Sequence, residues 1–299
     1  MDLEQLSNKK ISTSEKINKN TKYRNILFKF VLGTFTFLLI ALIVAAISNV
    51  LIKGVAGIGS SIRTPEIQFS VKLSLITSVI STSLCILFAV PIAYSMERLD
   101  IPGKSIINTI LNIPLALPPV VSGVALLLLF GTTTFGRKLA SFGLKFVFDV
   151  KGVILAQFFV NISYMIRILK STFSDIDPKL EFVGRTLGCT QFQSFMRITL
   201  PLAKNGLIAG TVITWARALG EFGAALMLAG ATRMKTETLP TSLYLNMSTG
   251  DIQYAMASAT IIILISIVAL LVFEKVGSGK GMILNKVKGG NHDWVSKSM

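Results

Sequence analysis

The chain has 299 residues, of which 52% are hydrophobic and 15% charged, and its mean hydropathy is +0.66. Soluble domains carry roughly 25% charged residues, so this composition excludes an ordinary soluble protein and indicates a membrane protein. The formal net charge of +15 would suit a nucleic-acid-binding protein, but no binding motif accompanies it. We therefore expect membrane lipid, and no nucleic acid, among the partners.

Six apolar stretches are long enough to cross a hydrocarbon core, which takes about 20 helical residues. They are 26–52, 70–96, 106–131, 152–173, 206–231 and 255–273. Because lipid cannot satisfy open backbone groups, we predict an all-α membrane protein with six transmembrane helices. A polar, lysine-rich arm (1–25), expected to be disordered or loosely bound to the membrane surface, precedes this transmembrane domain (26–274), and a polar tail (275–299) follows it.

The basic residues are distributed unevenly about the six stretches. Most of the 30 Lys and Arg residues fall in the arm, the tail and the loops on the same side as both termini. By the positive-inside rule, that side is the cytoplasm. We therefore predict a multi-pass protein of the plasma membrane with both termini inside the cell.

The third stretch contains Pro114, Pro118 and Pro119, followed by Ser122 and Gly123. Proline removes a backbone donor and clashes with the preceding turn, so a bent or interrupted helix is expected here. Irregular backbone at membrane depth persists only against protein or water. Two interpretations stay open: Pro118, Pro119 and Ser122 border a translocation path, or the segment is only a packing kink.

Polar residues interrupt the fourth and fifth stretches. Gln157, Asn161 and Tyr164 recur at helical spacing, where they either line a pore or join helices by hydrogen bonds. Arg217 at the centre of a span costs about 2.5 to 3.5 kcal/mol and needs a partner or a wet cavity. Glu221, four residues later, can supply an ion pair; alternatively, Arg217 meets an anion in transit. Asn161, Arg217 and Glu221 are thus candidates for the path or its gate.

The segment between the fourth and fifth stretches is typical of a docking element. It predicts a short cytoplasmic helix with one exposed acidic group, a break at Gly188 where a positive backbone angle is expected, and a proline that starts the next helix. The residues expected to carry docking are Glu181, Val183, Gly184, Arg185, Gly188, Ile198, Leu200 and Pro201.

No motif predicts catalysis. The tail sequence Gly277-Ser-Gly-Lys280-Gly lacks the first glycine and the Ser or Thr of a phosphate loop, so ATP hydrolysis must come from another chain if it drives this one. The spans hold no Ser/His pair, paired aspartates or zinc-protease motif, and the only histidine, His292, lies in the tail. We predict no catalytic residue, no metal site and no cofactor.

Five motifs occur in an order that resembles one family. They are Leu117-Pro-Pro-Val-Val121, Arg185-Thr-Leu-Gly188, Ile198-Thr-Leu-Pro201, Ala216-Arg-Ala-Leu-Gly-Glu-Phe-Gly-Ala224 and Thr236-Glu-Thr-Leu-Pro240. Together they resemble the molybdate/tungstate importer permeases of the ATP-binding-cassette (ABC) class, relatives of the sulfate permeases, over about residues 70–274. The family's usual Ala-Ala pair is Val183-Gly184 here, which predicts a less stable docking helix with an altered contact surface.

The resemblance implies a type I ABC importer permease fold whose docking segment is a cytoplasmic coupling helix. It also implies a homodimer with the path at its interface, two cytoplasmic ATPase subunits and an extracytoplasmic oxyanion-binding protein. Glu181 would then be a polar anchor in a groove of the ATPase, and residues 53–69, 132–151 and 232–254 would meet the binding protein.

The implied substrate is a tetrahedral oxyanion, foremost molybdate or tungstate, with sulfate or thiosulfate as the alternative. A secondary transporter driven by an ion gradient is the rival from another class. It would need internal repeats or broken helices paired across two halves, and the sequence shows only one strongly proline-broken span and no convincing repeat.

Overall fold

The computed structural model describes the backbone of residues 3–278 and, with few exceptions, the side chains of residues 25–271. The remainder of the predicted tail, residues 279–299, lies outside the described residues. The chain divides into two units, residues 1–53 and 54–299, and each is considered by itself.

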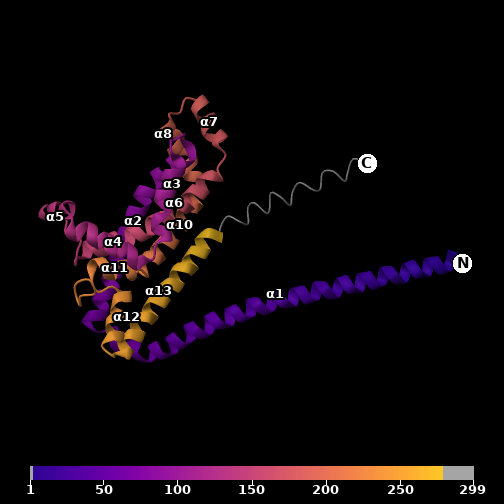
Figure 1. The fold of residues 1–299 in the computed structure, drawn as a ribbon, viewed down its shortest axis with the longest axis horizontal. Helices are drawn as coiled ribbons and strands as arrows, with labels where there is room; N and C mark the ends of the chain where they lie inside the picture. The colour runs from indigo at the N-terminus through magenta and orange to yellow at the C-terminus, as the bar shows by residue number, and fades with distance from the viewer. Residues whose placement is uncertain (1–2, 279–299) are drawn as a thin grey trace. The chain divides into compact units, whose positions relative to one another are not determined.

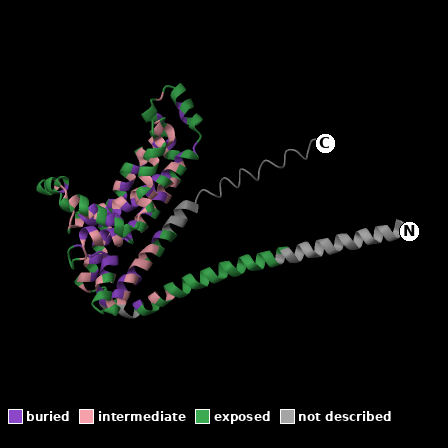
Figure 2. Ribbon diagram, in the orientation of Figure 1, coloured by how far each residue is buried: buried purple, intermediate pink, exposed green. Residues whose placement is uncertain are grey.

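The first unit is part of one long helix, α1 (Leu3–Ser61). Its apolar stretch, Leu27–Val55, is long enough to span a membrane, and the side chains of residues 27–47 that form most of it are exposed (Figure 2). The expectation of a disordered arm over residues 1–25 differs from this structure, in which the helix begins at Leu3. Residues 3–25 contain no proline or glycine, so nothing interrupts a helix that propagates from the apolar stretch.

The second unit contains the other five predicted spans. Three are continuous helices: α2 (Pro65–Arg98), α6 (Val150–Ser174) and α13 (Ile252–Ser278). The third span is α3 (Lys104–Ala116) followed by α4 (Pro119–Thr132), bent by 109°. The fifth is α10 (Lys204–Leu219) followed by α11 (Gly223–Ala229), bent by 56°. The six predicted spans are therefore four continuous helices and two broken pairs, and the all-α prediction is confirmed.

Shorter elements connect the spans. They are α5 (Thr134–Ser141), α7 (Pro178–Thr186), α8 (Gln191–Ser194), a π-helical turn (Phe195–Thr199), α9 (Leu200–Leu202) and α12 (Leu239–Ser248). Within the second unit, α7 and α8 lie at one end of the bundle made by α2, α3, α6 and α10 (Figure 1).

Among the described residues, three apolar clusters hold the second unit together, and the smallest contains Ile67, Leu239 and Ile261. One lies where α2 packs against α6 toward α7, and its fully buried members include Ala89, Met165 and Phe173. Another joins α4, α6 and α11 and contains Ala156 and other small side chains. Small residues let membrane helices approach closely, so close packing of side chains, and not the hydrophobic effect, holds these helices together.

The segment 232–254 differs from the expected outer loop. Residues 236–242 are buried, and α12 packs against α13 and α2. The Leu239 amide donates to Ser74 Oγ at 2.7 Å, and Arg233 donates to Asn246 Oδ1 at 2.9 Å. Of this segment, residues 232–235 and 247–253 are exposed, so these are the parts open to a partner.

Candidate functional site

The helix α7 is defined by local signals at both ends. Asp177 accepts the Lys179 amide at 2.9 Å, and Pro178 occupies the first turn, where its missing N–H costs nothing. At the other end, Gly188 has φ of +91°, and its amide donates to Arg185 O at 3.0 Å. The amide of Cys189 donates to Gly184 O at 3.1 Å, which completes a Schellman motif. The predicted helix and the positive angle at Gly188 are confirmed.

The chain after this turn is helical but irregular. A π-helical turn, Phe195–Thr199, ends with the Leu200 amide donating to Phe195 O. Pro201 follows in the three-residue helix α9, and α10 begins at Lys204. The widened turn accommodates Pro201, which has no N–H to donate. The expectation that Pro201 begins the long helix is therefore wrong, because it lies in α9 before α10.

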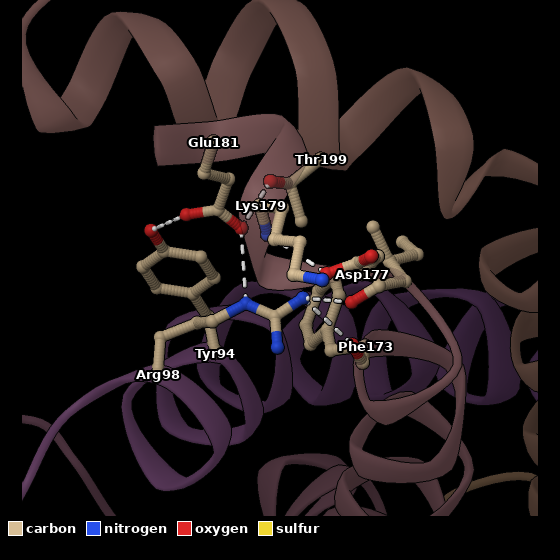
Figure 3. A network of polar contacts seen from close by, with 8 residues as sticks. Tyr94, Arg98, Phe173, Asp177, Lys179, Glu181 and Thr199 are labelled. Carbon is tan, nitrogen blue, oxygen red and sulfur yellow. Dashed lines mark hydrogen bonds and ion pairs between the residues drawn. The ribbon is translucent and has the colours of Figure 1, made fainter. Parts of the chain in front are cut away.

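Glu181 is buried, with 8% of its surface exposed, so the expectation of an exposed acidic group is wrong. Its Oε1 accepts from Arg98 Nε at 3.0 Å and from Thr199 Oγ1 at 2.5 Å, and its Oε2 accepts from Tyr94 at 2.8 Å (Figure 3). Arg98 also donates through Nη2 to the carbonyls of Phe173 and Ile176, at 2.9 and 2.6 Å.

We call Tyr94, Arg98, Glu181 and Thr199 the carboxylate clamp. It joins four parts of the chain: the end of α2, the end of α6, α7 and the π-helical turn. Burial by itself raises the pKa of the Glu181 carboxyl. Hydrogen bonds from Thr199, Tyr94 and Arg98, with the charge of Arg98, outweigh burial and hold that pKa below its usual value. The clamp therefore contains a carboxylate at neutral pH.

The outer surface of α7 and α8 is apolar. The exposed fractions are 65% for Phe182, 53% for Val183, 81% for Leu187 and 70% for Phe192. Arg185 on α7 is also exposed, whereas Gly184 is buried. An exposed apolar surface of this kind is typical of a protein interface.

The Val183-Gly184 pair has a structural explanation. Val183 faces outward, while Gly184 lies against Ile198, so that a Cβ at Gly184 would stand only 2.5 Å from Ile198 Cδ1. The glycine lets α7 lie close to the π-helical turn. Of the other candidates, Ile198 and Leu200 are half-buried and Pro201 is exposed.

The two broken spans meet each other. A Cβ at Gly123 in α4 would lie 2.7 Å from the Cα and carbonyl oxygen of Ala224 in α11. A Cβ at Gly223 would lie 3.2 Å from the Cβ of Pro119. Pro118 and Pro119 are exposed at the start of α4, and backbone approaches backbone where both helices begin. The one strongly proline-broken span expected from the sequence is α3 and α4. The structure adds a second break, between α10 and α11, which contains no proline to signal it.

Ser122 lies in the first turn of α4. Its side chain is fully buried, and among the described residues its Oγ has no hydrogen-bond partner. The structure thus places Ser122 inside the α4 packing and not at the exposed surface of Pro118 and Pro119.

Arg217 is exposed at the end of α10. Its Nε donates to Asn161 Oδ1 at 3.3 Å, and its guanidinium carbon lies 3.6 Å from the centre of the Tyr164 ring. Gln157 donates to Ala218 O at 2.9 Å and so fastens α6 to the end of α10. The polar row on α6 therefore joins helices and orients the arginine.

Glu221 does not pair with Arg217; among the described residues, no ion pair joins them. Glu221 is buried, and its Oε1 accepts the Ala224 amide at 2.9 Å. It thereby caps α11, whose first amides lack helical partners. The two residues lie on either side of the helix break, which separates side chains that a continuous helix would bring together.

Sequence reasoning missed three members of the clamp. Tyr94 and Arg98 stand four residues apart at the cytoplasmic end of a predicted span, a spacing that places them on one helix face. Thr199 lies inside the Ile-Thr-Leu-Pro motif. The available signal was the presence of a tyrosine and an arginine on one face at the end of an apolar helix. Their partner, Glu181, could not be inferred from this signal because it is distant in sequence.

Comparisons with known proteins cover both the carboxylate clamp and the two broken spans. The family described as "Binding-protein-dependent transport system inner membrane component" matches residues 89–276. The chain is 37% identical over 217 residues to the molybdenum transport system permease protein ModB of Escherichia coli K12, covering 70% of this chain and 93% of that protein. It is 29% identical over 257 residues to the sulfate transport system permease protein CysW of Synechocystis, covering 86% and 93%.

Among solved structures, a bacterial ABC transporter that imports the acidic polysaccharide alginate superposes with a TM-score of 0.66. The match covers 86% of this chain and 96% of that chain at 19% sequence identity. At this identity the likeness shows a shared fold.

Proposed function

Because this chain belongs to the family of inner membrane components of binding-protein-dependent transport systems, we propose that it imports a tetrahedral oxyanion, foremost molybdate or tungstate. The chain is an ABC importer permease, with the type I permease fold predicted from its sequence. It is a permease subunit and not an enzyme, and ATP hydrolysis is assigned to a separate ATPase.

One observation carries the oxyanion proposal: an exposed arginine lies within a membrane span. Arg217 on a lipid-facing surface would cost about 2.5 to 3.5 kcal/mol, so its surface must face water or protein. Asn161 and Tyr164 hold the guanidinium from one side and leave its terminal nitrogens free among the described residues. A fixed guanidinium with free donors suits a planar pair of oxyanion oxygens.

The same surface supports assembly with a second copy. Two copies of this chain would enclose Arg217 and the exposed Pro118 and Pro119 between them, which keeps the polar groups from lipid. The path would then run at the interface of a homodimer, with both termini in the cytoplasm. An extracytoplasmic oxyanion-binding protein would deliver the anion on the opposite side.

Two cytoplasmic ATPase subunits would dock on the apolar surface of α7 and α8. The carboxylate clamp supplies a physical link from this contact to the path. A displacement of α7 is transmitted through Glu181 and Arg98 to the end of α6. The same helix carries Asn161 and Tyr164, which hold Arg217. We propose that closure of the ATPase dimer moves the gate through α6.

The test is uptake by proteoliposomes that contain the permease, its ATPase and its binding protein. We expect accumulation of labelled molybdate that requires ATP, and weaker competition by sulfate than by tungstate. Stronger transport of sulfate than of molybdate would establish the alternative that the likeness to CysW supports. Absence of ATP-dependent oxyanion uptake would refute the proposal.

A secondary transporter is favoured by one specific observation, the pair of broken spans that meet at Gly123 and Gly223. The same proteoliposomes test it, because a secondary transporter works without the ATPase. Uptake by this chain alone under a proton or sodium gradient would establish that function, and we expect none.

A further inference from the structure

A cavity with polar and apolar walls lies between α3 and α6, and Leu115, Ala116 and Ile166 form its apolar part. Its volume is about 670 Å³. Asn108 and Asn112 line it from α3, and Arg167 and Lys170 line it from α6. Lys170 is four residues before the end of α6, and Asn108 is four residues after the start of α3. The cavity therefore extends along α3 from near its start to its last residue, Ala116.

The cavity is rich in hydrogen-bond donors. Lys170 Nζ donates to Asn108 Oδ1 at 2.6 Å and lies 3.8 Å from Glu97 Oε1, so one carboxylate partly compensates its charge. Arg167 is exposed, and among the described residues its guanidinium has no hydrogen bond or ion pair. Asn112 donates one amide hydrogen to Asn108 O at 2.6 Å. The cavity thus holds one uncompensated positive charge and several free N–H groups.

Arg167 also continues the polar row of α6. It lies three residues after Tyr164, which contacts Arg217, and roughly 4.5 Å further along the helix axis toward α7. Along α6, Arg167 therefore lies nearer the α7 end than the residues that contact Arg217.

We propose that this cavity binds a tetrahedral oxyanion group through Arg167, Lys170 and the side-chain amides of Asn108 and Asn112. The guanidinium fork binds two oxygens of such a group, and the ammonium and amides bind the others. The group has two possible sources, the transported anion on its way to the cytoplasm or the phosphate of an anionic lipid headgroup. The first source rests on the proposed function.

The experiment uses the full chain with its ATPase in nanodiscs of phosphatidylcholine alone, without the binding protein. Binding of labelled molybdate is measured for the wild type, Arg167→Gln, Lys170→Gln and the double variant. Lys72→Gln is the control, since Lys72 is an exposed lysine of α2 near the opposite end of the bundle. We expect Arg167→Gln to weaken one class of molybdate sites about tenfold or more, the double variant to lose that class, and the control to match the wild type. Molybdate that the double variant still binds is assigned to Arg217.

A second arm distinguishes the lipid source. Nanodiscs are prepared with equal phosphatidylcholine and phosphatidylglycerol, and lipid retained by the purified complex is measured by native mass spectrometry. Preferential retention of phosphatidylglycerol that Arg167→Gln abolishes identifies a headgroup phosphate as the occupant. If the wild type binds neither molybdate nor anionic lipid, or if the double variant binds both as the wild type does, the cavity is not an oxyanion site.

Failure of this site can be separated from failure of the proposed function. Wild-type complex with its binding protein is assayed for ATP-dependent uptake in parallel. Normal uptake with unaltered binding in the double variant overturns the cavity alone. No uptake of any oxyanion, together with Arg167-dependent retention of phosphatidylglycerol, overturns the import proposal and leaves the cavity a lipid site.

Discussion

Replacing Glu181 with alanine is expected to release α7 from the helix bundle while the spans stay folded. The carboxylate accepts three hydrogen bonds, from Tyr94, Arg98 and Thr199, and its removal leaves the Arg98 side chain at 9% exposure without a counter-charge. The free energy for undocking α7 should fall, because this helix of nine residues is too short to be stable by itself.

The magnitude follows from the contacts that remain. Removing one partner of a buried ion pair costs about 3 to 5 kcal/mol. Arg98 keeps the carbonyls of Phe173 and Ile176, so we place Glu181→Ala at the lower end, about 3 kcal/mol. Glu181→Gln keeps the shape and one acceptor oxygen, and should cost about 1.5 kcal/mol.

Hydrogen exchange of the α7 amides measures this free energy directly. For the permease in nanodiscs, we expect Glu181→Ala to speed exchange in α7 roughly a hundredfold, up to the loss of all protection, and Glu181→Gln roughly tenfold. Arg185→Gln is the matched control, because Arg185 is exposed on the same helix and contacts no clamp residue. It should change exchange by less than about twofold.

The dependence on pH has a definite sign. The pKa of Glu181 is held below its unfolded value of about 4.3, so the clamp stabilises docking fully above that value. This stabilisation is lost as the pH falls through the lowered pKa. After correction for intrinsic exchange rates, wild-type protection should decrease as the pH is lowered beyond the unfolded value and through the lowered pKa of Glu181, whereas Glu181→Gln should lack this step. Equal α7 protection in wild type and Glu181→Ala would refute the role of the clamp.

Three further predictions concern the turn and the broken spans. Gly188→Val should strain the backbone at φ of +91° by about 1 to 3 kcal/mol. Substrate-stimulated ATP hydrolysis should fall while membrane insertion persists. Normal stimulation of ATP hydrolysis would show that α7 and its turn only connect two spans. Arg217→Ala and Glu221→Ala should each lower thermal stability, because Arg217 and Glu221 attract each other only at longer range and no ion pair joins them. Their coupling in the double variant should stay well below the roughly 3 to 5 kcal/mol of a broken buried ion pair, and a coupling of that size would contradict this. Gly123→Ala should destabilise the protein by about 1 to 3 kcal/mol, because the added methyl group overpacks against the Ala224 backbone, and the melting temperature should fall. An unchanged melting temperature would show that α11 can shift to accommodate the methyl group.

The fold was largely predictable because long apolar runs permit few structures in lipid. The third stretch shows both the strength and the limit of this reasoning. Its prolines predicted the interruption that separates α3 from α4, but the bend of 109° depends on packing against α11. The break between α10 and α11 was missed, since glycines allow a break without requiring one.

The candidate site was predictable where the signals are local. Gly188 and the helix before it follow from turn chemistry within ten residues of sequence. The partners of Glu181 could not be predicted, because Arg98 is 83 positions away and only the packing of α2 on α6 brings it near. Likewise, Arg217 and Glu221 have the spacing of an ion pair, and the tertiary break overrides it.

The apolar surface of α7 and α8 has a consequence for the biosynthesis of the transporter. If the ATPase docks on this surface as we propose, a permease chain made in excess of its ATPase would leave Phe182, Leu187 and Phe192 exposed to water. Chaperones and proteases act on exposed apolar surface of this kind. Docking of the ATPase would remove that surface from water, so the abundance of the permease would follow the supply of its partner.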